Sequence, residues 1–70
     1  MFSLYDIVIL KTDRPDVNLT KGLEGVIIDY VEADDVYSVE FYDENGETID
    51  DSVLAYFRPD ELLFKERPKQ

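Results

Sequence analysis

The sequence contains no cysteine, no histidine and no tryptophan. Without cysteine the chain can form no disulfide bond, no zinc site built on thiolates and no cysteine nucleophile. Without histidine it lacks the commonest general base and the commonest transition-metal ligand of proteins. The catalytic and metal chemistries that depend on these residues are excluded. We therefore expect a protein that is not an enzyme and needs no cofactor.

Lysine and arginine are absent from residues 22–57. The whole chain has 7 basic and 17 acidic residues, which give a formal net charge of −10. Eleven of the acidic residues lie in that same stretch, here called the acidic block: Glu24, Asp29, Glu32, Asp34, Asp35, Glu40, Asp43, Glu44, Glu47, Asp50 and Asp51. Because phosphates are bound by lysine and arginine, this block argues against direct nucleic-acid binding and favours a basic partner.

Long apolar runs are also absent. No stretch approaches the roughly 20 apolar residues that a membrane-spanning helix needs. The first six residues contain no basic side chain of the kind that opens a secretory signal. We therefore expect a cytoplasmic protein with no membrane association. The 70 residues, 44% of them hydrophobic, suffice for one small domain whose core can use four phenylalanines and five tyrosines.

Short apolar and alternating stretches predict strands and no long helix. The stretch at 5–10 is rich in β-branched and apolar residues, and the stretch at 26–31 begins with residues that are apolar on both faces, as in a buried strand. Residues 36–42 alternate between apolar and polar side chains, which is typical of a strand with one buried face. The predicted strands cover residues 5–10, 26–31, 36–42, 47–49, 52–57 and 62–64.

Glycine, asparagine and proline mark the connections. Gly22 and Gly25 lead out of a long loop at 12–21, and Asn45-Gly46 is a strong hairpin signal. Pro59 is followed by two acidic residues, which predicts one short 3-10 or helical turn near the C-terminus. The sequence thus predicts an all-β fold, a small antiparallel barrel of about five strands. We expect it to fill residues 1–64 and to be followed by a flexible tail at 65–70.

Three motifs at these positions resemble the pattern of a known family. They are Lys21-Gly22-x-x-Gly25-x-Ile27, Val36-Tyr37-x-Val39-Glu40-Phe41-x-Asp43-x-x-Gly46 and Pro59-x-Glu61-Leu62. Over residues 4–64 the chain is similar to the small bacterial proteins grouped as domain of unknown function 4926, which are similar in turn to SH3-like barrels. The resemblance implies an SH3-like barrel in a short bacterial protein that accompanies another gene product. It implies no activity, and the acidic block exceeds what the pattern requires.

Three other motifs suggest functions that the sequence does not support. Leu4-Tyr5-Asp6 echoes the proline-binding SH3 domains, but their groove uses tryptophan, which is missing here. The pairs Asp34-Asp35 and Asp50-Asp51 could supply an acid and a base only across a cleft, with carboxyls roughly 5 to 9.5 Å apart. Residues 43–47 fail as an EF-hand, because Phe41 would occupy the first ligand position. Solvated turns explain these acids more simply than a loose divalent-metal site does.

The sequence therefore predicts a protein–protein interaction module whose acidic face binds a basic surface of a partner protein. Antitoxin-like, immunity-like and nucleic-acid-mimic binders are of this kind. Aromatic anchors would accompany the charges. The candidate partner-binding residues are Asp29, Tyr30, Glu40, Tyr42, Asp43, Glu44 and Glu47. The alternatives are a structural accessory subunit without charge recognition and an acidic face that serves only solubility. We expect a monomer or a weak homo-oligomer.

Overall fold

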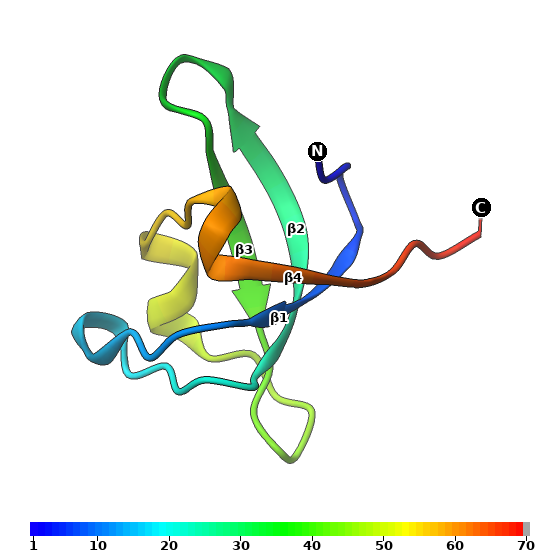
Figure 1. Cartoon of the computed structure of the whole chain (residues 1–70). Helices are drawn as coiled ribbons and strands as arrows, with labels where there is room; N and C mark the ends of the chain where they lie inside the picture. Colours follow the sequence, from blue (N-terminus) through cyan, green and yellow to red (C-terminus); the bar gives the residue numbers. More distant parts are fainter. Residues whose placement is uncertain (70) are drawn as a thin grey trace.

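The computed structural model of the chain describes residues 1–69 (Figure 1). One antiparallel sheet runs in the order β3-β2-β1-β4 and contains β1 (Ile7–Leu10), β2 (Glu24–Val31), β3 (Val36–Phe41) and β4 (Leu62–Glu66). The other described elements are the 3-10 turns η1 (Pro15–Val17), η2 (Glu32–Asp34), η3 (Asp50–Leu54) and η4 (Pro59–Glu61). The prediction of an all-β domain is confirmed.

The core lies against one face of this sheet, where alternate strand residues meet. Along β3 the exposure alternates as predicted, so that every second side chain is buried. The fully buried rings of Phe41 and Phe57 pack edge to face, with centroids 5.2 Å apart. The buried hydrophobic residues are Val8, Leu10, Leu19, Ile27, Tyr37, Val39, Phe41, Ala55, Phe57 and Leu62.

Two of the predicted turn glycines have different physical roles. Gly22 has a φ of +98°, a conformation that side chains disfavour, and its N–H donates to the carbonyl of Leu10 at 2.8 Å. Gly25 lies within β2, where an added Cβ would be only 2.7 Å from Phe41 Cδ1 and 2.8 Å from Val39 Cγ1. Gly25 therefore allows β2 to lie close against the core side chains of β3.

The predicted Asn45-Gly46 turn is present, but the strand predicted after it is not. The N–H of Gly46 donates to the carbonyl of Asp43 at 3.0 Å, and Gly46 adopts a φ of +79°. The chain then forms one isolated bridge, between Thr48 and Tyr42, the residue that directly follows β3. Residues 47–49 form no further strand pairing, because the chain turns into η3 directly after Ile49.

The strand predicted at residues 52–57 is wrong, since η3 occupies the first half of this stretch. Ser52 is fully buried, and its hydroxyl donates to the carbonyl of Ile49 at 2.7 Å and accepts the N–H of Phe41 at 3.2 Å. These bonds hold the chain in a tight turn that a strand could not follow. Only Phe57 pairs with β3, through two backbone bonds to Tyr37 of 2.7 and 2.8 Å.

The end of the chain contains the predicted turn and the predicted last strand. Pro59 opens η4, and the Glu61 carboxylate accepts the N–H of Arg58 at 3.0 Å, which caps that turn. β4 follows and continues to Glu66, past residue 64, where the sequence predicts that the domain ends. Beyond it, Arg67 forms an ion pair with Asp6. Of the predicted tail, Gln70 lies outside the described residues.

Candidate functional site

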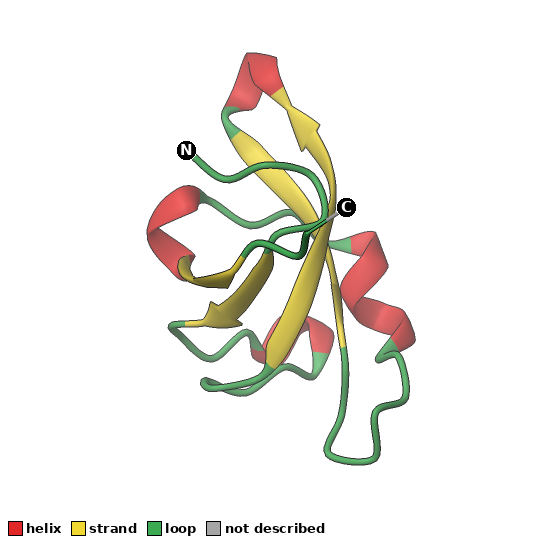
Figure 2. Ribbon diagram, turned by 90° about the vertical axis from the view of Figure 1, so that its right-hand side faces the viewer, coloured by secondary structure: helices red, strands yellow, loops and turns green. Residues whose placement is uncertain are grey.

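The seven candidate partner-binding residues lie at the two ends of the β2–β3 hairpin. Asp29 and Tyr30 lie near η2, whereas the other five lie at the opposite end, around the turn that follows β3. Figure 2 shows these two ends at the top and bottom of the long hairpin. The structure thus brings five of the predicted residues together. Their carboxylates, here called the turn-end acids, are those of Glu40, Asp43, Glu44 and Glu47.

Glu40 is the most firmly placed of the turn-end acids. The hydroxyl of Tyr42 donates to Glu40 Oε1 at 2.6 Å, and the hydroxyl of Thr48 lies 3.5 Å from the same oxygen. The bond to Glu40 raises the pKa of Tyr42, because a phenolate would face the carboxylate as a second negative charge. Both side chains are partly exposed at the end of β3, and these hydrogen bonds hold the Glu40 carboxylate in place.

Asp43 has an additional structural role that its neighbours do not share. Its Oδ1 accepts the N–H of Asn45 at 2.9 Å and the N–H of Glu47 at 3.0 Å, which closes the turn. The side chains of Glu44 and Glu47 are exposed and lie on this short turn. The turn therefore presents two freely solvated carboxylates next to two that are held in place.

Tyr30 and Asp29 are engaged locally at the other end. The Tyr30 ring lies 4.7 Å from the Tyr37 ring, and its hydroxyl donates to Asp35 Oδ1 at 2.9 Å. That bond raises the pKa of Tyr30. Asp29 Oδ1 accepts the N–H of Tyr30 at 2.8 Å. Tyr30 therefore packs against the edge of the core. Tyr56, which is not among the seven candidates, is more exposed, at 57%.

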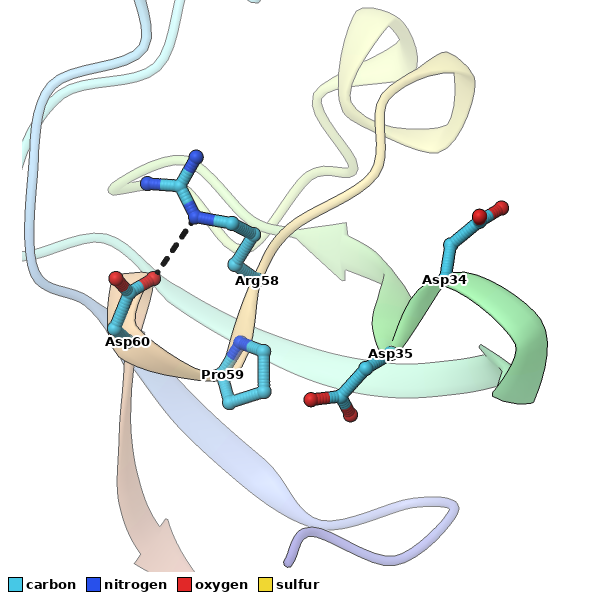
Figure 3. A pocket seen from close by; sticks show the side chains of 5 residues that line it. All are labelled: Asp34, Asp35, Arg58, Pro59 and Asp60. Atoms are coloured by element: carbon cyan, nitrogen blue, oxygen red, sulfur yellow. Dashed lines mark hydrogen bonds and ion pairs between the residues drawn. The ribbon is translucent and has the colours of Figure 1, made fainter.

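A shallow hollow of about 350 Å³ lies between η2 and η4 (Figure 3). It is lined by Asp34, Asp35, Arg58, Pro59 and Asp60. Arg58 donates to Asp60 at 3.1 Å, and in Figure 3 the Asp35 carboxylate points toward Pro59 while Asp34 points away from it. No signal in the sequence places the Asp34-Asp35 pair beside residues 58–60, because only the tertiary fold brings these segments together.

The distribution of ion pairs separates the acidic block from the rest of the chain. Within residues 1–69 the ion pairs are Arg14–Asp16, Arg14–Glu61, Arg58–Asp60, Lys65–Glu24 and Arg67–Asp6. Glu24 is the only member of the acidic block in these pairs, so its ten other carboxylates have no cationic partner in the described part of the chain. The negative charge of the block is therefore left uncompensated.

The metal alternative gains no support from the side-chain positions. The chain has no histidine or cysteine, so aspartate and glutamate are the side chains left to bind a metal ion. Among residues 1–69 no three of these carboxylates are grouped so that they could hold one. Likewise, the described part of the chain has no helix of the length and apolarity that crossing a membrane requires.

Comparison with known proteins gives a family and no activity. Neither the curated proteins nor the solved structures contain a significant match to this chain. The family described as Domain of unknown function (DUF4926) matches residues 4–62, a region that includes the three motifs noted in the sequence and ends at Leu62, the first residue of β4. The chain therefore belongs to the DUF4926 family.

Proposed function

We propose that this protein is a non-enzymatic interaction module of the bacterial cytoplasm that binds a basic surface of a partner protein through its turn-end acids. The observation that carries the proposal is the uncompensated charge of the acidic block, in which ten of eleven carboxylates lack a cationic partner in residues 1–69. Antitoxin-like, immunity-like and nucleic-acid-mimic proteins would all use such a surface.

The energetics favour a partner. Carboxylates of one sign held on strands and short turns repel one another, and a small domain has little stability to spare. Glu40 and Asp43 are fixed by hydrogen bonds, so these charges cannot relax far apart. A basic partner would remove this repulsion on binding and would be attracted from a distance, which raises the association rate.

We further infer that the sheet belongs to an SH3-like barrel. Four strands form the sheet in residues 1–69. Two isolated bridges, Tyr37–Phe57 on β3 and Tyr42–Thr48 directly after it, lie at the edge where a fifth strand of a barrel would pair. η4 directly before β4 is the short helical turn that the sequence predicts for this fold.

A second candidate function is that of an accessory subunit that docks without charge recognition. The observation that favours it is that aromatic rings away from the turn-end acids are exposed: Tyr5 is 56% and Tyr56 is 57% exposed. Large exposed aromatic side chains are typical anchors of protein interfaces. This alternative predicts an affinity that hardly changes with salt.

The experiment begins with capture of partners from the native host at low salt, followed by association kinetics with the purified partner. The double variant Glu44→Lys/Glu47→Lys should reduce the association rate by roughly tenfold or more, and the wild-type affinity should fall steeply as salt is raised. Glu32→Lys at the η2 end provides a positional comparison and should have a smaller effect per charge. An affinity that is independent of salt and of these reversals would reject charge recognition.

A further inference from the structure

The face of the sheet opposite the core carries a continuous group of aliphatic side chains. In the sheet register Val26 of β2 lies opposite Ile7 of β1, and Leu63 of β4 lies opposite Ile9 of β1. Directly opposite residues share a face, and Ile7 and Ile9 share one because successive strand side chains alternate. Ile7, Ile9, Val26 and Leu63 therefore form one patch across three strands, here called the outer stripe.

No helix or strand in residues 1–69 packs on the outer stripe from the side opposite the core. None of its four residues belongs to the hydrophobic core or is among the partly buried residues that pack against it. Leu63 is 54% exposed, and the other three are partly exposed. The apolar residues on both faces of β1 and β2 are typical of strands that are covered on both sides. Because the core covers only one side here, the other side is suited to a partner.

Carboxylates border the outer stripe. Glu24 lies opposite Ile9, and Glu40 lies opposite Val26. Glu66 lies opposite Ile7 at the end of the sheet, past a register shift between Ile7 and Val8. Glu40 is also one of the turn-end acids, so the outer stripe and the proposed acidic binding surface are continuous. A partner that covers the stripe would therefore meet carboxylates on several sides of an aliphatic centre.

One ion pair crosses the stripe. Lys65 on β4 pairs with Glu24 on β2, and β1 lies between these two strands. The two side chains are each 47% exposed. Ion pairs of this exposure stabilise a protein by about 1 kcal/mol or less. A lysine or arginine from a partner could therefore replace Lys65 at Glu24 with little loss of stability.

We propose that the outer stripe docks a basic amphipathic helix of the partner protein, an inference that rests on the proposed function and specifies its partner. β2 and β4 are separated by two strand spacings, roughly 10 Å, which is close to the width of one helix with its side chains. Aliphatic residues along the centre of the helix would cover the stripe. Lysine or arginine residues on both sides of that centre would reach Glu24, Glu40 and Glu66.

A second copy of this chain is a poorer occupant. A symmetric dimer places the same surface patch of both subunits face to face. The carboxylates that border the stripe would then lie near their own counterparts, with a net charge of −10 on each chain. Like charges across an interface oppose association, whereas a helix bordered by lysine or arginine is complementary to this surface.

The test uses a synthetic helical peptide with leucine along one side and lysine on both borders, and a control peptide with glutamate in place of lysine. NMR titration should show the largest shifts at Ile7, Ile9, Val26 and Leu63 for the lysine peptide only. Leu63→Ser should weaken binding about tenfold, by loss of apolar contact. Leu54→Ser, a matched change at a side chain that is 80% exposed on η3, should leave affinity unchanged.

A second pair of variants separates docking on the stripe from general attraction. Lys65→Met and Lys21→Met remove the same charge, but only Lys65 crosses the stripe. Lys65→Met should tighten lysine-peptide binding several-fold more than Lys21→Met does. Equal effects, or shifts confined to the turn-end acids, would overturn the docking site and leave the proposed function standing. Equal binding of both peptides would overturn both proposals, and concentration-dependent shifts at the stripe without peptide would instead indicate a second copy.

Discussion

The guanidinium of Arg14 lies over the ring of Phe57, with Cζ 4.8 Å from the ring centroid. The same group donates to Glu61 at 3.2 Å and to the carbonyl of Tyr56 at 3.0 Å. Arg14 thereby ties the long loop between β1 and β2 to the segment that contains η4. Because Glu61 is only 8% exposed, its negative charge depends on this arginine for compensation.

Replacing Arg14 should therefore destabilise the whole domain. Arg14→Met leaves the Glu61 carboxylate unpaired and removes the cation from the Phe57 ring, so we expect the free energy of unfolding to fall by about 3 kcal/mol. Arg58→Met is the control, since Arg58 and Asp60 are both mostly exposed. Its unfolding free energy should fall by less than about 1 kcal/mol. Urea denaturation measures both. Equal losses would show that Arg14 contributes no more than a surface ion pair does.

The buried carboxylate of Asp6 predicts a loss of stability in acid. Arg67 donates to it at 2.8 and 3.0 Å, the Ser3 N–H donates at 2.8 Å, and the bonds from Arg67 lower the pKa of Asp6. Since the folded-state pKa is below the unfolded value of about 3.9, this stabilisation is fully present above that value. It is lost as the pH falls through the lower folded-state pKa.

Asp6→Asn should therefore lower the melting temperature at pH 7 and reduce the unfolding free energy there by about 2 kcal/mol. The variant should also lose less stability than the wild type does between about pH 5 and pH 2. Thermal denaturation across this pH range measures both effects. Asp60→Asn is the matched exposed control. An Asp6→Asn curve that is parallel to wild type through the acid range would show that Asp6 does not contribute to acid unfolding.

Gly25 should tolerate no side chain. The nearest atoms to an added Cβ belong to Phe41 and Val39, both fully buried, so neither can move away easily. Gly25→Ala is expected to lower the free energy of unfolding by about 3 kcal/mol. Gly46→Asn is the comparison, because Gly46 lies in open space and asparagine tolerates its positive φ. A smaller loss for Gly25→Ala than for Gly46→Asn would contradict the close approach of β2 and β3.

Mutual repulsion within the acidic block should be visible in the free protein. Adding salt shortens the Debye length to about 10 Å at 0.1 M, so the melting temperature should rise with moderate salt. Glu44→Gln/Glu47→Gln should raise the melting temperature at low salt and make it less dependent on salt. Replacing Asp16, which is paired with Arg14, by asparagine should not raise it. A melting temperature that is flat in salt would show that the carboxylates are too far apart to repel one another.

The parts of the fold that follow from local sequence were predictable. Apolar and polar residues alternate over 36–42, and buried and partly exposed side chains alternate along β3. Pro59 and the two acidic residues after it mark η4. The strands predicted at 47–49 and 52–57 do not form because of Ser52. Its buried hydroxyl bonds to both Ile49 and Phe41, which holds the chain in η3. No propensity signals that bond, because it depends on a strand eleven residues earlier in the chain.

The candidate site was predictable in composition more than in position. The uncompensated charge could be read from the acidic block. Glu40 and Tyr42 lie together because side chains two residues apart in an extended chain share a face. The separation of Asp29 and Tyr30 from the other candidates follows from the length of the β2–β3 hairpin, which periodicity does not reveal. The outer stripe depends on pairing between the first and last strands, so it requires the tertiary register.

The pairing of β1 with β4, reinforced by Asp6 and Arg67, also constrains how the chain can fold. The two strands are joined only when residues 62–67 have been synthesised, so the sheet cannot be completed while those residues are still inside the ribosome. Contacts this distant in sequence favour slow folding, on the order of milliseconds to seconds. Until then β1 lacks one neighbour, and the newly made chain exposes an unpaired, strongly apolar strand edge that can aggregate or be held by a chaperone.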